Sequence, residues 1–349
     1  MSLILQALSV IIGLGFLVFI HELGHFLAAK MCKVNVVTFA FGFGPDLIKH
    51  TYKGTKYCIK AVPFGGFIGM AGETPDKATG AEGEYLSLVW YKKIWILFAG
   101  PFSNYIFAIF LFAFIFNVWG IVHSDTNCSI GYVVENSSAA LAGLRSGDKI
   151  KSIDAVEINT WSDLIANLRS KAGKYAYFII ERGNNSFELN MLVAKNSLTK
   201  AGEIGVRPLK TKISFMESAC LGIKFSIQQT VLPVIYLVNR VVSLKKPDIS
   251  GPVGIIRLMA DAAREGVQDY LKLIAFISIA LGLFNLFPIP MVDGGMILLF
   301  LVEGIIRKQI NAKVIQVYNT IGLILISAIF LLATYNDLLQ LNIMKLFVK

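Results

Sequence analysis

The sequence predicts a multi-pass α-helical membrane protein with about four transmembrane helices, a membrane-associated β region and an inserted α+β domain. Of its 349 residues, 55% are hydrophobic and the mean hydropathy is +0.63, which is typical of proteins that cross a bilayer several times. Apolar runs that exceed the roughly 20 residues needed for a transmembrane helix alternate with polar stretches. One polar stretch, of about 90 residues, is long enough to fold as a domain of its own.

The order of apolar and polar stretches predicts seven segments and their sides of the membrane. Basic residues follow the first apolar run and none precedes it, so the N-terminus, the α+β domain and the C-terminus are expected to be extracytoplasmic. The segments are transmembrane helix 1 (1–33), a cytoplasmic-side β-hairpin region and loop (34–93), transmembrane helix 2 (94–122), the α+β domain (123–209), an amphipathic linker (210–270), transmembrane helix 3 with a broken centre (271–306), and transmembrane helix 4 with the C-terminal tail (307–349).

The charge and cysteine content exclude two classes of function. The net charge is +10, but the basic residues are scattered and flank apolar runs, which favours the lipid bilayer as a partner and argues against nucleic acid. The four cysteines form no C-x-x-C pair, so neither a thiolate zinc cluster nor a redox motif is expected. Cys128 and Cys220 would lie on the oxidising side of the membrane, and the sequence leaves their pairing open. The first apolar run lacks the basic start of a signal peptide and is read as a retained helix.

The first transmembrane helix carries the strongest functional signal. His21, Glu22 and His25 are its only titratable residues between Leu3 and Ala29, and each costs several kcal/mol in a bilayer. The two histidines are four residues apart and therefore share one helix face. This H-E-x-x-H arrangement predicts a Zn²⁺ site in which Glu22 takes a proton from metal-bound water, whose pKa falls to about 7. The alternative is a set of satisfied polar groups between packed helices.

The third transmembrane helix is predicted to break over residues 285–295. Pro288 and Pro290 remove backbone donors, and the Gly-Gly pair that follows Asp293 frees the dihedral angles. Irregular backbone at membrane depth is tolerated only where it is buried in protein or lines a wet cavity. Asp293, a lone carboxylate in an apolar run, is predicted as the third zinc ligand, which leaves the fourth position to water. A helix-capping aspartate is the alternative.

Two further features are candidates for support of this site. Residues 34–72 alternate in the manner of strands, and such a sheet could pair its edge with a substrate strand at Gly65 and Gly66. The alternative is a linker that only packs on the helices. Asn104, in the Ala99-Gly100-Pro101-x-x-Asn104 run of the second helix, is a lone amide that needs a partner and serves either packing or the site. The expected strands are Val34–Phe41, Leu47–Tyr52, Tyr57–Val62 and Phe64–Met70.

The polar stretch at 123–209 has the pattern of a soluble α+β module. Tyr175–Glu181 is predicted to pair with Phe187–Val193 through the turn at 183–185. The Ala-Gly-Leu-Arg-Ser-Gly-Asp-Lys-Ile run at 142–150 resembles a PDZ domain of the bacterial type. The resemblance implies a groove between a strand and a helix that accepts a peptide end.

Four features together resemble the site-2 protease family of intramembrane zinc metalloproteases, and more closely its bacterial RseP-like branch. They are His21-Glu22-x-x-His25, Ala99-Gly100-Pro101-x-x-Asn104, the inserted PDZ-like module, and Asn285-x-x-Pro288-x-Pro290-x-x-Asp293-Gly294. The resemblance implies that His21, His25 and Asp293 bind Zn²⁺ and that Glu22 is the catalytic acid and base. It also implies that Asn285, with the Pro288 and Pro290 loop, holds an unwound substrate.

The same resemblance implies a place and a partner. Members of this branch lie in the bacterial cytoplasmic (inner) membrane and cut a single-pass membrane-protein substrate, such as a trimmed anti-sigma factor or a remnant signal peptide, in regulated intramembrane proteolysis. Two departures are visible: Met296 stands where many relatives have a histidine after Asp-Gly-Gly, and there is room for one PDZ-like module only. The second departure weakens the expectation that substrates are filtered by size.

Two rival functions remain open from the sequence. Intramembrane His, Glu and Asp side chains also mark metal or ion transporters, although no internal repeat is found. A membrane-tethered PDZ adaptor with a structural metal site is the other, but structural zinc sites are usually closed by four protein ligands and three are found here.

Overall fold

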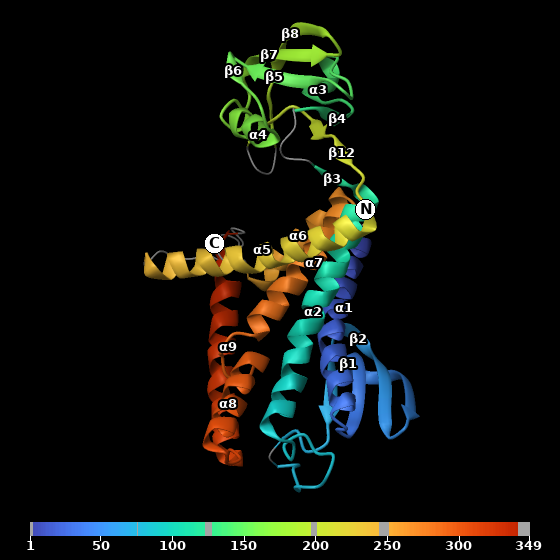
Figure 1. The fold of residues 1–349 in the computed structure, drawn as a ribbon, viewed down its shortest axis with the longest axis vertical. Helices are drawn as coiled ribbons and strands as arrows, with labels where there is room; N and C mark the ends of the chain where they lie inside the picture. The colour runs from blue at the N-terminus through green and yellow to red at the C-terminus, as the bar shows by residue number, and fades with distance from the viewer. Residues whose placement is uncertain (1–2, 75, 123–127, 197–200, 244–250, 341–349) are drawn as a thin grey trace, which may run out of the picture. The chain divides into compact units, whose positions relative to one another are not determined.

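The computed structural model describes residues 3–74, 76–122, 128–196, 201–243 and 251–340, and these divide into two compact units (Figure 1). Unit 1 comprises Met1–Ile115 with Met216–Lys349, and unit 2 comprises Phe116–Phe215. Unit 1 holds every predicted catalytic and metal-binding residue, whereas unit 2 corresponds to the predicted α+β insertion. The two units are described separately below.

Unit 1 is built from long apolar helices and one β region. Among the described residues, five helices have the length and composition to cross a membrane, namely α1, α2, α5, α7 and α9. Many of their large apolar side chains are exposed, as expected of a surface that faces lipid: Ile4 on α1 is 78% exposed and Leu331 on α9 is 67% exposed. The helices are α1 (Leu3–Met31), α2 (Trp90–Trp119), α5 (Phe215–Val242), α6 (Pro252–Glu265), α7 (Val267–Asn285), α8 (Asp293–Ile306) and α9 (Ala312–Gln340).

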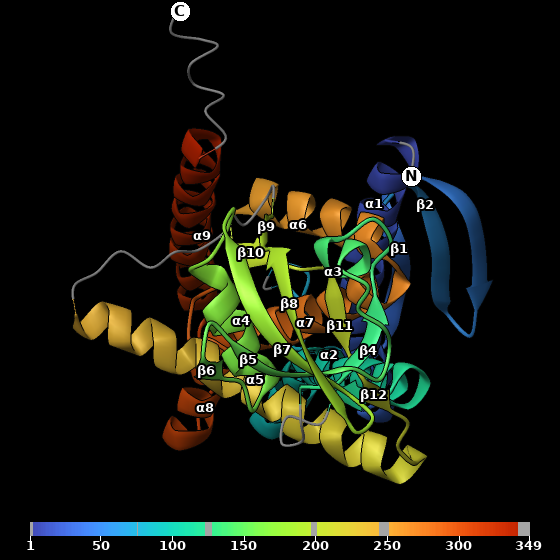
Figure 2. The same cartoon turned by 90° about the horizontal axis from the view of Figure 1, so that it is seen from above.

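Helix α5 differs in direction from the other long helices of unit 1. It runs across the direction of α1 and α9 (Figure 1), and the view from above shows it at nearly full length (Figure 2). This segment was expected to be an amphipathic linker, yet its length and hydropathy would also allow it to span a membrane. The expected number of about four transmembrane helices therefore stays a prediction.

The predicted break in the third transmembrane segment is confirmed. Helix α7 ends at Asn285 and α8 begins at Asp293, with Met291 between them in a positive-φ conformation of 76°. The two glycines after Asp293 allow the chain to turn back on itself, because a Cβ on Gly295 would lie 1.9 Å from the carbonyl oxygen of Ile289. Helix α9 packs against the loop, since a Cβ on Gly322 would lie 2.3 Å from the carbonyl oxygen of Pro290.

The β region consists of two long bent strands, so the prediction of four short strands was wrong. Strand β1 (Val36–Tyr52) and β2 (Thr55–Met70) are joined by a two-residue turn at 53–54. The predicted gap at Gly42 to Asp46 is a series of bulges within β1, where Gly42 and Gly44 have positive φ. The sequence looked interrupted there because glycines at bulges read as breaks.

Because both strands bend, each pairs with its neighbour twice. Residues 38–41 pair with 56–59 on one side and with 66–69 on the other, and residues 46–52 also pair with 55–60. The spatial order of segments is therefore 46–52, 55–60, 36–41 and 66–70. Segments 46–52 and 66–70 form the two edges of this sheet within the described residues.

Unit 2 contains a four-stranded antiparallel sheet in the order β6-β5-β7-β8 over an apolar core. Tyr175 pairs with Leu192 and Glu181 with Ser186, which confirms the predicted hairpin, although its turn is only two residues long. Helix α4 begins with a capping box, in which Thr160 and Asp163 exchange hydrogen bonds. The helices and strands of unit 2 are β3 (Ile121–Val122), β4 (Ile130–Val133), α3 (Ser138–Leu141), β5 (Lys149–Ile153), β6 (Val156–Glu157), α4 (Trp161–Arg169), β7 (Tyr175–Arg182), β8 (Asn185–Leu192), β9 (Ala194–Lys195), β10 (Gly202–Glu203), β11 (Val206–Pro208) and β12 (Lys210–Thr211).

Candidate metal and peptidase site

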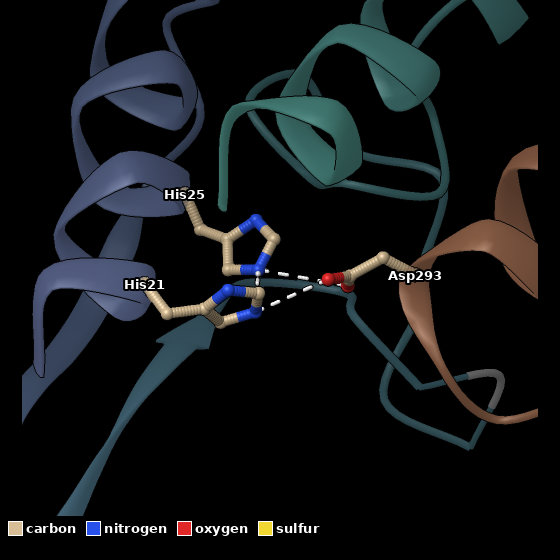
Figure 3. A group of neighbouring side chains, drawn as sticks. All are labelled: His21, His25 and Asp293. Atoms are coloured by element: carbon tan, nitrogen blue, oxygen red, sulfur yellow. Dashed lines mark hydrogen bonds and ion pairs between the residues drawn. The ribbon is translucent and has the colours of Figure 1, made fainter. Parts of the chain in front are cut away.

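Two histidines from α1 and the aspartate that opens α8 meet inside unit 1. Figure 3 shows the three side chains pointing toward one another from the two helices. His21 Nε2 lies 3.1 Å from Asp293 Oδ2, His25 Nε2 lies 3.5 Å from Asp293 Oδ1, and the two Nε2 atoms are 3.1 Å apart. Among the described residues, this trio has ligand atoms that all lie within 4.8 Å of one another.

The spacing of these atoms fits a zinc ion. Nitrogen and oxygen ligands at about 2.0–2.2 Å from a tetrahedral zinc lie roughly 3.3–3.6 Å from one another. The observed separations between the histidine nitrogens and the Asp293 oxygens, 3.1 Å and 3.5 Å, lie close to this range. Both histidines are buried, and three protein ligands leave a coordination position for water, as in catalytic rather than structural zinc sites.

Helix α2 fixes the orientation of His25. The Nδ1–H of His25 donates to the carbonyl oxygen of Ile96 at 2.7 Å, which leaves Nε2 with a lone pair for a metal. Gly100 makes room for the ring, because a Cβ there would lie 2.3 Å from His25 Nε2. Helices α1 and α2 also approach closely at Gly24, where a Cβ would lie 2.2 Å from the carbonyl oxygen of Ala99.

Asn104 plays the corresponding part for His21. Its amide group is fully buried and lies 3.2 Å from His21 Nδ1, while Asn104 Oδ1 is buried without a hydrogen-bond partner. Exchanging the amide nitrogen and oxygen, which have the same shape, lets Oδ1 accept a hydrogen bond from His21 Nδ1–H. In that arrangement His21 Nε2, like His25 Nε2, presents a lone pair to the metal position.

Glu22 lies beside the trio and is held by the β region. Its Oε2 accepts a hydrogen bond from the backbone N–H of Ile68 at 3.1 Å, so the carboxylate contacts edge segment 66–70. Gly66 lies next to it, since a Cβ on Gly66 would be 3.7 Å from Glu22 Cγ and 2.8 Å from the carbonyl oxygen of Ala40. The carboxylate is therefore positioned between the candidate metal ligands and the edge of the sheet.

The other predicted residues fall into two groups. Asn285 approaches the site, with Nδ2 3.4 Å from His21 Nε2. Pro290 instead shapes the loop, since a Cβ on Gly295 would lie 3.0 Å from Pro290 Cα, and Pro288 lies in the same loop. Gly65 is a bend residue with φ of 93° against the ring of Phe43, so its role is in the turn of the chain.

Sequence reasoning missed several groups that hold the site. The carbonyl oxygen of Ile96 and the N–H of Ile68 belong to the main chain and have no signature in the sequence. A buried ion pair was also missed: Lys93 Nζ donates to Glu303 Oε1 at 2.8 Å and ties α2 to α8. The available signal was Glu303, a glutamate within an apolar stretch, because a carboxylate in such a stretch requires a partner.

Two buried histidines on a helix long and apolar enough to cross a membrane, a partly buried aspartate and an adjacent glutamate together form a candidate metallopeptidase centre. The model of the family described as Peptidase family M50 matches residues 9–329. The chain belongs to this family, which consists of integral membrane, zinc-dependent site-2 proteases, and it is accordingly a zinc metalloprotease.

Relatives support the assignment over nearly the full length. A protein of Campylobacter jejuni, named as a predicted zinc metalloprotease, is 32% identical over 96% of this chain and 93% of its own length. Similarly named proteins of Clostridium acetobutylicum and Agrobacterium fabrum are 31% and 29% identical, and cover 94% and 95% of this chain and 95% of their own lengths.

Two of the solved structures similar to part of the chain are PDZ domains of SdrC-like proteins. The PDZ domain of an SdrC-like protein of Listeria monocytogenes is 20% identical and covers 26% of this chain and 93% of its own, with a TM-score of 0.23. A score this low decides nothing about the fold. The assignment of unit 2 as a PDZ domain therefore stays a prediction from its sequence.

Proposed function

We propose that this zinc metalloprotease is an intramembrane endopeptidase that cleaves a transmembrane helix of a membrane-protein substrate, as in regulated intramembrane proteolysis. The observation that carries the proposal is the meeting of His21, His25 and Asp293 between α1 and α8, which belong to the lipid-facing part of unit 1. A trimmed anti-sigma factor and a remnant signal peptide are the substrate classes we favour. The cytoplasmic membrane of a bacterium is the proposed location.

The roles follow from the geometry. His21, His25 and Asp293 are proposed to hold zinc, which when bound lowers the pKa of a coordinated water to about 7 and polarises a carbonyl. Glu22 is proposed to take the proton from the attacking water and to pass it to the leaving amine. Asn104 and the carbonyl oxygen of Ile96 keep the histidine rings in the binding orientation. The Asn285 amide, close to His21, is placed to donate to a substrate carbonyl.

The substrate must lose its helical structure before cleavage. An α-helix hides each carbonyl in an internal hydrogen bond, so the scissile carbonyl is exposed only after local unwinding. Edge segment 66–70 offers a partner for the unwound strand next to Glu22, because no other strand pairs with that edge within the described residues. Strand addition there would place the substrate backbone beside the candidate metal ligands.

Topology and the role of unit 2 are proposed from the sequence. Lys30 lies in the last turn of α1, Lys33 follows the helix, and Lys92 and Lys93 lie in the first turn of α2, which favours the cytoplasmic side for these ends. Unit 2 would then lie outside the cytoplasm and offer a peptide-binding groove, so that it selects substrates by a peptide end. Deleting residues 129–193 should leave zinc binding intact and relax substrate choice, and loss of zinc from an otherwise folded protein would refute this division.

The assignment of roles is tested by comparing zinc content with cleavage of a reporter helix in detergent. Glu22→Gln should keep zinc and lower the cleavage rate by about 10²–10⁴-fold, because the amide retains the shape but cannot take a proton. His21→Ala and Asp293→Ala should lose both zinc and activity. Equal loss of zinc in all three variants would show that Glu22 is a ligand and that the assignment is wrong.

The requirement for unwinding is tested on the substrate. Replacing Ala or Leu by Gly near the cut site costs a helix about 1 kcal/mol, which raises the unwound population by about fivefold if unwinding is a fast pre-equilibrium. Initial rates on a graded series of reporter helices should rise accordingly, whereas the same substitutions a few turns away should have little effect. Rates that do not follow helix propensity would contradict strand addition while leaving the protease assignment in place.

A further inference from the structure

An apolar cavity lies between α1 and the face of the sheet formed by β1 and β2. It has a volume of about 470 Å³ and is separate from the candidate metal site. Phe16 and Phe19 of α1 form one wall, and the sheet forms the other. The sheet residues that line it are Phe39, Phe41, Ile48, His50, Tyr57, Cys58 and Ile59.

The cavity lies at the depth of the hydrocarbon. The turn of the hairpin is level with the basic end of α1, because Lys30 Nζ donates to Thr55 Oγ1 at 2.8 Å. The far bend of the sheet is level with Gly15, where a Cβ would lie 2.3 Å from the carbonyl oxygen of Pro63. At 1.5 Å per residue, Gly15 and Lys30 are about 22 Å apart along α1. Phe16 and Phe19 therefore line the end of the cavity that is deep in the membrane.

A substrate strand bound at the catalytic edge would not reach this cavity. The lining comes from segments 46–52, 55–60 and 36–41, whereas edge segment 66–70 contributes no lining residue. Segment 36–41 stands between the cavity and the edge that contacts Glu22. The occupant must then be an apolar molecule that enters from the bilayer, and a lipid acyl chain has the required chemistry.

The charges on the same hairpin select the type of lipid. Residues 36–70 contain four lysines and one aspartate. Asp46 already pairs with Lys56 and Lys60, and Glu73 is engaged with the N–H of Met70 at the opposite edge. The exposed lysines that remain are Lys49 and Lys53. Because side chains alternate along a strand, Lys49 lies on the face of the sheet opposite to Ile48 and His50, whereas Lys53 is at the turn that follows the strand.

We propose that this is a binding site for an anionic phospholipid, whose acyl chain fills the cavity while its headgroup binds Lys53. The arrangement suits one molecule, because Lys53 directly follows the strand that contributes Ile48 and His50 to the cavity. The bound chain replaces protein contacts that the cavity lacks and supports the sheet whose far edge holds Glu22. The proposal depends on the membrane location of the family and not on the identity of the substrate.

The test uses the full-length protein in phosphatidylcholine nanodiscs that contain phosphatidylglycerol with a photoreactive group in the acyl chain. Labelling should concentrate on the peptides around Phe16 and Phe19 and around Ile48 to Ile59. Ile59→Trp should fill the cavity and abolish this labelling, while Val62→Trp, on the same strand but outside the cavity, should not. Zinc content, measured in parallel, shows whether each variant remains folded.

The headgroup contact is tested by charge. Lys53→Gln should weaken labelling by phosphatidylglycerol by about fivefold, as expected for one lysine near an anionic surface, whereas Lys49→Gln, on the opposite face of the sheet, should not. A phosphatidylcholine probe that labels the cavity equally well would overturn the anionic specificity. Labelling spread evenly over all lipid-facing helices, or a reporter helix that blocks the cavity labelling, would overturn the site itself.

Discussion

The two units bury polar side chains for opposite reasons. In unit 2 the carboxylate of Asp148 is fully buried and completely satisfied, because Arg182 donates to both of its oxygens and the Arg145 N–H donates as well. In unit 1 several polar groups converge on one place, and Asp293 Oδ2 is buried there without a hydrogen-bond partner. Satisfied groups hold a fold together, whereas spare lone pairs at buried positions indicate a binding site.

Unit 1 also contains polar contacts of the satisfied kind, and one of them joins the helices of the site. Lys93 and Glu303 are both buried and pair with each other, and Lys93 Nζ lies 4.9 Å from the centre of the Phe300 ring. Helix α2 orients the histidines and α8 carries Asp293, so this pair joins the two helices that bring the ligands together. We expect it to act on stability rather than on chemistry.

The largest expected effect tests that distinction. Lys93→Ala leaves the Glu303 carboxylate buried and unpaired, which should cost about 3–5 kcal/mol of unfolding free energy. Thermal unfolding in detergent measures the loss, and Lys92→Ala is the control from the neighbouring position. The double variant Lys93→Met with Glu303→Leu should recover most of the stability, because an apolar pair avoids desolvation of both charges. A double variant as unstable as the single one would show that the charges themselves are needed.

A smaller effect is expected where the partner of a ligand is removed. Asn104→Ala should weaken zinc binding by about 10–100-fold, because His21 loses the group that fixes its ring and tautomer. Competition with a chelator measures the affinity, and Asn117→Ala on the same helix is the control. Unchanged affinity would mean that Asn104 serves packing, the alternative that the sequence left open.

The smallest effect concerns unit 2 and depends on pH. Burial alone would raise the pKa of Asp148, but hydrogen bonds from Arg182 and the Arg145 N–H outweigh it and hold the pKa below 3.8. The stability from this carboxylate is therefore fully present above pH 3.8 and is lost as the pH falls through the lower folded value. Because Arg182 is partly exposed, the contribution is about 1 kcal/mol.

Hydrogen exchange of the β5 and β7 amides in the full-length protein measures this dependence. Protection should fall with acidification in the native protein, and Asp148→Asn should show lower protection that no longer depends on pH in that range. Glu188→Gln, on the neighbouring strand β8, is the control. If Asp148→Asn and the native protein respond to acid in parallel, another group governs the acid stability of unit 2.

The residues that we propose as zinc ligands could be predicted because titratable side chains are unusual in a membrane-spanning segment. A titratable side chain in an apolar run is costly, so His21, His25 and Asp293 stand out even though about 270 positions separate the histidines from the aspartate. The break before Asp293 was equally visible in its prolines and glycines. The sequence alone therefore identified three residues whose possible ligand atoms the structure places within 4.8 Å of one another.

The remaining contacts were out of reach for physical reasons. The carbonyl of Ile96 and the N–H of Ile68 are main-chain groups that every residue possesses, so only the fold shows which of them is used. The bent strands were missed because the glycines at their bulges have the same appearance as glycines in loops. The pairing of Lys93 with Glu303 joins positions that are far apart in the chain, and nothing local relates them.

The hydrogen bond between Glu22 and Ile68 has a consequence for the protein at rest. The Ile68 N–H that donates to Glu22 lies on the edge where a substrate strand would pair. The carboxylate and the substrate would therefore compete for one hydrogen-bond donor. Without substrate, the carboxylate that we propose as the general base is held by a main-chain N–H of its own protein. A substrate strand that pairs with the edge would displace the Glu22 carboxylate from this hydrogen bond and free it for proton transfer. The carboxylate would then become available only when substrate is bound, which would limit hydrolysis in its absence.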